Sequence, residues 1–434
     1  MKAIFLKILS ALLKKLAKAT LWRYRPIILG ITGNVGKSST KEALALVLGN
    51  EKRVRRPLKS FNNELGLPLT ILGDWEFTGG GFFWLKVVVV SFFRLFRKSR
   101  AYPEILILEY GVDKPGDMKY LLEVARPQIG IVTAIGDLPV HIEFFTSRES
   151  LIREKAKLIS SLPATGFAIL NADDADVLGM KENSKAKIIT FGFSEEADLK
   201  IGNLTTSFGE NFRGITFKLT YNGSSVPVRL KNVLGKAQSY AAAAAAATGL
   251  MFGLNLVKIA EALAIYSPPP GRFKIIPGIK ESTIIDDTYN AAPLAMRGAL
   301  ETLGELDAPR KIAVLGDMLE IGKWTIEAHE EIGRLAAKAV QILITVGEKA
   351  KFIAESARGA KMPKDSVFDF FDIYEAGKFL QGLIRAGDVV LVKASQSVRL
   401  EKIVKEVMAE PEKAEKLLVR QNKEWLAKKG IYEK

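Results

Sequence analysis

The stretch that decides the fold is residues 26–49, PIILGITGNVGKSSTKEALALVLG. A short apolar run rich in isoleucine ends at a glycine loop, and the residues after the loop have helical periodicity. Strand, glycine loop and helix in this order form phosphate-binding sites. Gly33 and Gly36 allow close backbone approach, Lys37 supplies a positive charge, and Ser38 is placed to ligate magnesium. The sequence therefore predicts a nucleotide site.

This loop departs from the eight-residue Walker pattern, because Ile31 stands where that pattern has its first glycine. The alternative is a chance glycine-lysine turn, which the flanking strand and helix patterns disfavour. The loop residues that we expect to contact the nucleotide are Gly33, Asn34, Gly36, Lys37, Ser38 and Ser39.

Composition limits the other classes of function. At 434 residues the chain should divide into two or three domains, and 48% hydrophobic with 26% charged residues is typical of a globular protein. The absence of cysteine excludes disulfides, thiolate metal sites and a cysteine nucleophile. A net charge of +15 favours anionic partners, and only two histidines are present, so a metal must rely mainly on oxygen ligands.

The first 26 residues predict a basic amphipathic helix. Interrupting lysines and the strand that follows disfavour a signal peptide or a membrane span. Two interpretations stay open: a helix at a membrane surface, or a helix docked on its own domain. The expected apolar face holds Phe5, Leu9, Leu12 and Leu16, opposite Lys7, Lys14 and Lys18.

Residues 81–100, GFFWLKVVVVSFFRLFRKSR, are nearly all apolar until a basic end. The run is short for a membrane span and is interrupted by Lys86 and Arg94. Its aromatic residues are suited to a headgroup boundary and its basic residues to lipid phosphates, with burial against the protein as the alternative. The residues concerned are Phe82, Phe83, Trp84, Phe92, Phe93 and Phe96, with Arg94, Arg97, Lys98 and Arg100.

Several motifs together carry a family resemblance. The shorter form TGNVGKSS, residues 32–39, resembles the ATP loop of the Mur ligase family, which includes the folylpolyglutamate and cyanophycin synthetases. NNELGLPLT at 62–70, and GDMLEIG at 316–322 followed by His329, are similar to segments of the members that add D-alanyl-D-alanine. The resemblance covers roughly residues 28–408 with its motifs in the family order.

The resemblance implies an α/β fold: a P-loop central domain with a mostly parallel sheet, then a C-terminal Rossmann-like α/β domain. The proline-rich segment SPPPGRFKIIPG marks a linker, so we place the boundary near Gly271. Alternation around two turns in 197–232 predicts antiparallel strands, and the alanine run 241–247 predicts a helix. The expected units are an arm (1–27), a central domain (28–270, with the 81–100 insertion) and a C-terminal domain (271–434) ending in a charged helical tail.

The resemblance also implies a magnesium site. Glu109 ends a buried strand, and a buried glutamate without a metal would need a basic partner. By likeness to the family, Lys155 would react with carbon dioxide to give a carbamate, which requires a neutral amine; Lys157 is the competing candidate. The expected metal ligands are Ser38, Glu109, His141 and carbamoylated Lys155, which with Lys37 and His329 make up the predicted catalytic residues.

The nucleotide contacts implied by the resemblance reach across the linker to Arg272, Asp287 and Asn290. The segment that reads adenine in the family departs from its pattern, with Ala237 and Ala241 at family histidine and asparagine positions. Gln238 remains as an amide there. We therefore expect a looser or differently arranged nucleotide preference, and strict ATP dependence in a competition assay would count against this.

For the substrates, the resemblance points to two groups of residues. Asn62 and Asn63 would face the carboxylate substrate, and His329 would orient the incoming amine. Ala394 and Gln396 replace the usual glycine and arginine, which predicts a narrower or less cationic acceptor pocket. The predicted substrate residues are Asn62, Asn63, Asp317, Glu320, Lys393 and Ser395.

The function implied is an ATP-dependent acid–amino-acid ligase of peptidoglycan precursor synthesis, using ATP and Mg²⁺. It would add D-alanyl-D-alanine to an anionic UDP-muramoyl-tripeptide-like carboxylate through an acyl phosphate, although the separate UDP-gripping domain of such members is not expected in this chain. Two alternatives stay open: another amide ligase of the superfamily, folylpolyglutamate-like, or a membrane-associated nucleotide-binding protein without ligase activity. We expect a cytoplasmic monomer, at the inner face of the membrane if the apolar segments bind lipid, and no nucleic-acid partner.

Overall fold

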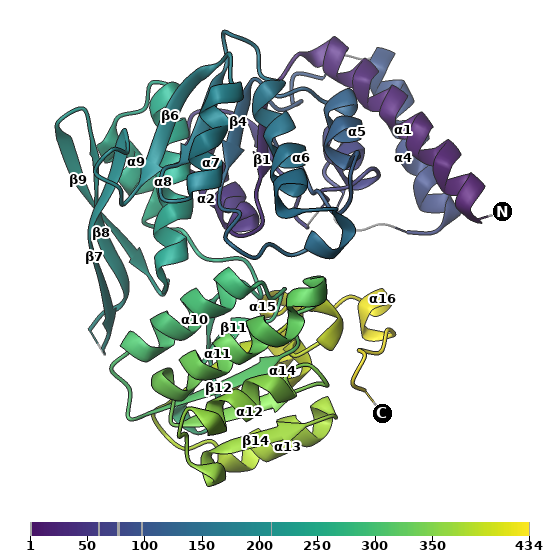
Figure 1. The fold of residues 1–434 in the computed structure, drawn as a ribbon. Coiled ribbons are helices and arrows are strands. Elements are labelled where there is room, and N and C mark those ends of the chain that lie inside the picture. Colours follow the sequence, from purple (N-terminus) through teal and green to yellow (C-terminus); the bar gives the residue numbers. More distant parts are fainter. Residues whose placement is uncertain (1, 60, 76–78, 97–98, 210, 434) are drawn as a thin grey trace.

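The computed structural model describes residues 2–59, 61–75, 79–96, 99–209 and 211–433. It contains two sheets, one in each of two α/β domains (Figure 1). The nine-stranded sheet has the order β2 (Val54–Arg55), β3 (Ile105–Glu109), β1 (Ile27–Thr32), β4 (Ile129–Val132), β5 (Phe167–Asn171), β6 (Lys187–Gly192), β7 (Leu199–Phe208), β8 (Arg213–Tyr221) and β9 (Ser224–Lys231). The six-stranded sheet has the order β10 (Lys274–Pro277), β11 (Thr283–Asp287), β15 (Asp388–Lys393), β12 (Arg310–Gly316), β13 (Ile342–Val346) and β14 (Val367–Phe370).

Both sheets are mostly parallel, which confirms the predicted fold class. In the larger sheet only the β7–β8 and β8–β9 pairs are antiparallel, and these are the strands expected within 197–232. In the smaller sheet only the β10–β11 pair is antiparallel. Parallel strands need covered faces, and helices supply the cover. The helices of the central domain are α1 (Lys2–Tyr24), α2 (Lys37–Gly49), α3 (Gly66–Leu72), α4 (Gly81–Phe96), α5 (Asp117–Val124), α6 (Arg148–Ser160), α7 (Ala175–Gly179), α8 (Lys236–Met251) and α9 (Leu256–Leu263).

A hydrophobic core lies on each face of the larger sheet. On one face α2, α8 and α9 pack against the strands. The alanine run of α8 is helical, as predicted, and is buried there, where its small side chains allow α8 to pack closely on α2. On the other face α5 and α6 cover the strands. The order of the sheet places β1 beside β3 and β4, so the loops that follow these three strands meet at one edge.

Helix α1 packs on its own domain, against α3, α4 and α5. Its buried apolar side chains are Leu9, Leu13, Leu16 and Ala17. The predicted apolar face was therefore partly wrong, since Phe5 is 51% exposed and Leu12 is 40% exposed. Apolar residues occur around most of this helix, so the neighbouring helices, rather than the periodicity, decide which side is buried.

The smaller sheet is covered by α10 (Pro293–Glu305), α11 (Thr325–Ala339) and α12 (Lys351–Gly359) on one face and by α13 (Ile373–Leu383) and α14 (Glu401–Val407) on the other. The tail differs from the expected charged helix, because it forms only α15 (Ala414–Leu417) and α16 (Lys423–Leu426), of four residues each. Leu418 is buried in the core and Arg420 has a left-handed φ of 59°, which interrupts a helix. The tail is thus anchored on the domain by a few side chains, while many of its residues stay exposed as expected.

Candidate active site

The phosphate loop lies between β1 and α2. Gly33 (φ 135°) and Gly36 (φ 92°) have backbone conformations that favour glycine, and a Cβ on Gly33 would stand 2.2 Å from the Thr133 hydroxyl. No side chain of the described residues caps α2 at Gly36. The first amides of a helix have no acceptor within it, so they point at the loop and attract an anion. The loop is therefore built to receive phosphate oxygens.

Glu109 lies directly beside this loop, at the end of β3 and in register with Ile31 of β1. Its side chain is 1% exposed, one carboxylate oxygen lies 3.1 Å from Lys41 Nζ, and the other accepts a hydrogen bond from Ser38 Oγ at 3.5 Å. Lys41 is the basic partner that a buried glutamate requires. Ser38 and Glu109 together present hard oxygen donors next to the phosphate loop, which is the donor set that magnesium prefers.

Lys37 is the first residue of α2, and its ammonium folds back on the loop. Its Nζ donates hydrogen bonds to Gly33 O at 2.6 Å and to Asn34 O at 3.4 Å. Burial lowers the pKa of Lys37 to about 8, with Glu109 opposing and Arg272 adding to the effect. A partly desolvated cation in this position gains most from an arriving phosphate, because the phosphate restores the lost solvation.

Lys155 projects from α6 into the same region and is 1% exposed. Burial, with Lys37 next in size, lowers the pKa of Lys155 to about 7, so much of the amine is neutral near neutrality. Lys157 has a different environment: its side chain is 47% exposed and its Nζ lies 2.5 Å from Glu154 Oε2. These surroundings favour Lys155 over Lys157 as the lysine that reacts with carbon dioxide.

His141 joins the two domains. Its Nδ1 lies 2.8 Å from a Glu320 carboxylate oxygen in the C-terminal domain, and its Nε2 lies 3.4 Å from Asp113. Within the described residues no three His, Asp or Glu side chains are grouped closely enough to hold a metal ion. Magnesium that is already bound to phosphates needs only one or two protein ligands, and the donors of Ser38 and Glu109 fit that need.

Arg272 is the first of the predicted nucleotide contacts beyond the linker. Its Nη2 lies 3.5 Å from Ser38 Oγ, and its guanidinium lies 3.8 Å from the centre of the Tyr289 ring. Gln238 is already engaged, since its Nε2 donates to Arg272 O at 3.3 Å and its Oε1 accepts from Tyr266 at 2.7 Å. The amide expected to read the base therefore also links α8 to the linker.

The remaining predicted contacts of the C-terminal domain form a second small network. Lys393 Nζ lies 2.6 Å from Asp287 Oδ2 and donates to Asn290 O at 3.0 Å. Ser395 Oγ accepts from Leu319 N at 2.9 Å. These bonds hold the ends of β11 and β15 and the loop after β12 together at the edge of the sheet that faces the central domain.

On the side of the carboxylate substrate, the two asparagines have different roles. Asn62 O accepts from Gly111 N at 2.9 Å, which ties its loop to the end of β3. Asn63 Oδ1 accepts from Gly66 N at 2.9 Å, so this side chain starts α3. The side chain of Asn63 is therefore engaged in its own loop, whereas the contact of Asn62 is made by its main chain.

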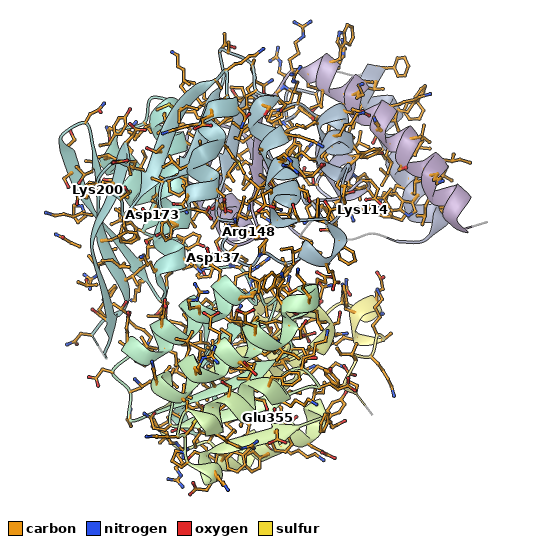
Figure 2. All side chains as sticks on the ribbon, viewed as in Figure 1. Lys114, Asp137, Arg148, Asp173, Lys200 and Glu355 are labelled. Carbon is orange, nitrogen blue, oxygen red and sulfur yellow. The ribbon has the colours of Figure 1, made fainter. Side chains whose placement is uncertain are left out.

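A single cavity of about 1750 Å³ between the two domains collects most of the predicted site residues. Figure 2 labels Arg148 and Asp137 on the side of the central domain that faces the C-terminal domain. The predicted residues in its wall are Asn34, Gly36, Lys37, Ser38, Ser39, Asn62, Asn63, Glu109, His141, Lys155, Gln238, Arg272, Asp287, Asn290, Glu320, Lys393 and Ser395. Gly33, Asp317 and His329 are not in the wall of this cavity.

Comparison with known proteins places the chain. Residues 90–249 match the Mur ligase middle domain, and residues 271–396 match the domain described as Mur ligase, glutamate ligase domain. A UDP-N-acetylmuramoyl-tripeptide–D-alanyl-D-alanine ligase of Mycobacterium leprae is 34% identical over 90% of this chain and 75% of its own length. The chain belongs to the Mur ligase family.

Other relatives agree with this Mur ligase assignment, which confirms the predicted resemblance. The enzyme of the same name from Bacillus subtilis is 30% identical over 92% of this chain and 79% of its own length. A crystal structure of MurF ligase from Thermotoga maritima in complex with ADP has a TM-score of 0.75 and 27% identity, covering 93% of this chain and 84% of that one.

In this Mur ligase, His329 is a buried structural group rather than a residue of the cavity wall. Its Nε2 accepts from Met318 N at 3.0 Å and its Nδ1 lies 2.6 Å from Thr325 O. Asp317 is likewise enclosed, accepting from Ala350 N at 2.7 Å and from the Tyr432 hydroxyl at 2.6 Å. The GDMLEIG motif therefore shapes the loop that presents Glu320, and Asp317 of the motif and His329 of α11 hold that loop in place.

Burial lowers the pKa of His329 to about 4, from an ordinary value of 6.5, so the unfolded chain takes up the proton first as pH falls. The stability that depends on neutral His329 is complete above about pH 6.5 and is lost progressively down to about pH 4. The loss should amount to about 3 kcal/mol of unfolding free energy. Urea unfolding at a series of pH values should show a shallower acid slope for His329→Gln than for the native chain, and equal slopes would contradict this.

Several residues of the Mur ligase site escaped sequence reasoning. Lys41 follows Lys37 by four residues on α2, so helical spacing was a usable signal for it. Trp84 of α4 lines the cavity while packing in the core formed with α1 and α3, which no local pattern indicated. Tyr289 and Arg420 also belong to the wall, and only tertiary contacts reveal them.

Proposed function

We propose that this Mur ligase joins D-alanyl-D-alanine to the carboxylate of a UDP-muramoyl tripeptide at the expense of ATP. The observation that carries the proposal is the cavity between the domains, where the phosphate loop, Glu109 and Lys155 meet the Arg272 and Lys393 groups of the C-terminal domain. The names of the Mycobacterium leprae and Bacillus subtilis relatives supply the substrates, and the ADP complex of the Thermotoga maritima relative supports the nucleotide.

The chemistry answers a simple difficulty, since an amine does not displace oxide from a carboxylate. The substrate carboxylate attacks the terminal phosphorus of ATP, giving an acyl phosphate and ADP. The amine then attacks the acyl carbon, and inorganic phosphate leaves as the amide forms and the amine loses a proton. Both steps place negative charge on oxygens that must be neutralised and aligned.

Several residues of this chain are positioned to neutralise and align the negatively charged oxygens. Lys37 and the first amides of α2 face the phosphates, and Arg272 brings a second cation from the other domain. Magnesium, when bound through Ser38 and Glu109, supplies further neutralisation of phosphate charge. The contact between His141 and Glu320 holds the domains closed over the cavity and helps to exclude water from the acyl phosphate.

Phosphate release tests the function directly. Release should require ATP, a UDP-muramoyl tripeptide and D-alanyl-D-alanine together, and omission of any one should reduce it to background. The same assay with folate and glutamate tests the folylpolyglutamate alternative. Phosphate release with folate and glutamate instead of the muramoyl pair would replace the proposed substrates. Nucleotide binding with no ligation of either pair would support the non-ligase alternative that the alanines at 237, 241 and 394 motivate.

We also propose that a face formed by α1 and α4 binds an anionic membrane surface. No helix among the described residues is long and apolar enough to cross a membrane. The two helices pack side by side (Figure 1) and leave a set of large apolar side chains in solvent, with exposed lysines on the same helices. The apolar members of this α1/α4 face are Phe5, Leu6, Ile8, Leu12, Phe82, Leu85, Val89, Phe92, Phe93 and Phe96.

The basic end of the 81–100 segment is only partly described, with Arg94 and Arg100 both exposed. Arg94 donates to Leu72 O at 2.8 Å, so its guanidinium is partly engaged within the protein. Arg97 and Lys98 lie outside the described residues. Lys7, Lys15 and Lys86 are exposed and supply the positive charge of the α1/α4 face. Trp84 packs beneath this face and also lines the cavity, so a membrane bound here would lie next to the substrate entrance.

Vesicle binding tests the α1/α4 face. Phe82→Ser with Phe93→Ser should weaken flotation with vesicles that contain phosphatidylglycerol by about tenfold or more, because each phenylalanine loses its apolar burial. The two side chains are 82% and 66% exposed, so folding should be unaffected. Phe371→Ser, an exposed phenylalanine of the C-terminal domain, is the matched control. Equal flotation of all variants, or flotation that does not depend on anionic lipid, would refute the proposal.

A further inference from the structure

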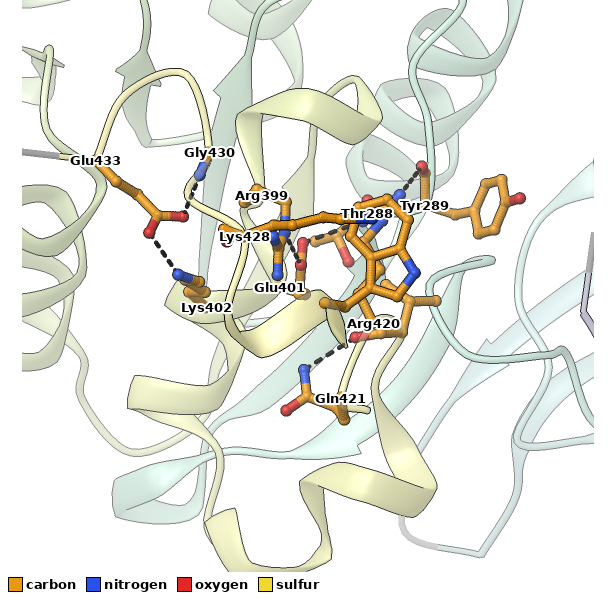
Figure 3. Close-up of polar contacts among 12 residues, drawn as sticks. Thr288, Tyr289, Arg399, Glu401, Lys402, Arg420, Gln421, Lys428, Gly430 and Glu433 are labelled. Atoms are coloured by element: carbon orange, nitrogen blue, oxygen red, sulfur yellow. Dashed lines mark hydrogen bonds and ion pairs between the residues drawn. The ribbon is translucent and has the colours of Figure 1, made fainter. Parts of the chain in front are cut away.

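The C-terminal tail reaches back to the nucleotide side of the cavity through one arginine. Arg420 Nη1 donates to Thr288 O at 3.1 Å, and its Nη2 donates to Tyr289 O (Figure 3). Its side chain is 5% exposed. These two carbonyls lie between Asp287, the last residue of β11, and Asn290, so the tail binds the backbone of a predicted nucleotide-binding segment.

A buried carboxylate, that of Glu401, holds Arg420 in this position. Glu401 is fully buried, and its carboxylate lies 2.5 Å from Arg399 Nε and 3.1 Å from Arg420 Nη1. Arg399 in turn donates to Lys428 O at 2.8 Å, which closes the tail over the pair. A buried carboxylate shared by two arginines is costly to assemble unless its geometry is fixed, and here it fixes the direction of Arg420.

The contact continues from Tyr289 to the phosphate loop. Tyr289 N donates to Gly271 O at 3.1 Å, so its backbone is held by the linker on one side and by Arg420 on the other. Its ring lies 3.8 Å from the guanidinium carbon of Arg272, whose Nη2 lies 3.5 Å from Ser38 Oγ. A continuous series of contacts therefore runs from Glu401 through Arg420 and Tyr289 to Arg272. Arg272 lies next to Ser38 of the phosphate loop.

We propose that Arg420 is a positioning residue for the nucleotide: it fixes Tyr289, whose ring holds the Arg272 guanidinium against the phosphate loop. The tail is thus a working part of the ATP site. This inference rests on the nucleotide binding of the proposed function but not on its acceptor substrates. A stacked guanidinium loses rotamer freedom before the ligand arrives, so the phosphates meet an arginine that is already oriented.

Calorimetric titration of the full chain with ADP and magnesium tests this. Arg420→Lys keeps a cation opposite Glu401 but cannot hold both carbonyls, and it should weaken ADP binding about tenfold. Tyr289→Leu should weaken it by a similar factor, and the double variant should be no weaker than either single one, because both remove the same support. Lys413→Ala changes an exposed tail residue paired with Glu410 and should bind ADP as the native chain does.

Steady-state kinetics separate positioning from a general loss of structure. In Arg420→Lys the KM for ATP should rise about tenfold while the KM for the muramoyl tripeptide is unchanged, because only the nucleotide side loses its support. Equal ADP affinity in Arg420→Lys and the native chain, or additive effects in the double variant, would overturn the inference alone. A native chain that binds no ADP would overturn the proposed function and this inference together.

Discussion

Replacing Lys37 by methionine is expected to lower kcat by ~10³-fold, because this ammonium neutralises charge that develops on the transferred phosphoryl group. Methionine keeps most of the length and apolar stem of lysine. Burial already lowers the pKa of Lys37 to about 8, so removing its charge should not destabilise the fold. The measurement is phosphate release with saturating substrates, accompanied by thermal unfolding of the same preparation.

Two further variants sharpen this test. Lys37→Arg keeps the charge but replaces a compact ammonium by a planar fork, and should recover only a small part of the activity. Lys52→Met changes an exposed lysine just beyond α2 and should leave kcat as in the native chain. A Lys37→Met variant that retains kcat within about tenfold of native would show that the phosphate loop is not the reacting site.

The phosphate loop was predictable because its determinants are contiguous. The strand, the two left-handed glycines and the lysine lie within a few residues of one another, and each has a local physical reason. Glu109 was nearly as easy to predict, because it is the last residue of an apolar strand and parallel strands end at a common edge of the sheet. The fold class followed from the resemblance to the Mur ligase family.

Tertiary packing decided what the sequence left open. The buried side of α1 depends on α3 and α4, so periodicity assigned Phe5 and Leu12 to the wrong side. His329 matched a family motif, yet both ring nitrogens are occupied by backbone groups of its own loop. Arg420 lies in a segment whose charged composition indicated a solvated surface, and only its contacts across 131 residues to Tyr289 show otherwise.

The expected change in nucleotide preference also depends on tertiary contacts. Gln238 was the amide left to read the base, but Tyr266 and the Arg272 carbonyl use it. Alanine at 237 and 241 leaves the wall near α8 without a polar side chain at these two positions. Loose base preference remains a prediction, and competition between ATP and other nucleoside triphosphates is its measurement.

Lys155→Met is expected to lower kcat by ~10²–10³-fold, because the variant loses the negative charge of a carbamate rather than the positive charge of an ammonium group. A neutral lysine amine adds to carbon dioxide, forming an N–C bond and releasing one proton, and the product carries a negative charge. An amine with an ordinary pKa is neutral in only about one molecule in three thousand at pH 7. Burial lowers the pKa of Lys155 to about 7, so about half of the amine is available there.

The test is dependence on carbon dioxide. Activity of the native chain should fall in buffer depleted of carbon dioxide and recover with bicarbonate, and the fall should be greater below pH 7, where Lys155 is protonated. Acetate should partly restore Lys155→Ala, since it brings a carboxylate to the space that the side chain leaves. Lys157→Met is the matched control and should respond to carbon dioxide as the native chain does, because Lys157 is half exposed and paired with Glu154.

The pH dependence distinguishes this role from a simple cation at the site. A protonated Lys155 acting on phosphate would favour activity at low pH, since the charge is complete below the lowered pKa and lost above it. A carbamate requires the opposite, because only the neutral amine reacts. If the activity of the native chain rises as pH increases through 7, and Lys155→Met loses this rise, Lys155 acts as a carbamate anion. If activity falls over the same pH interval, Lys155 acts as a cation beside Lys37.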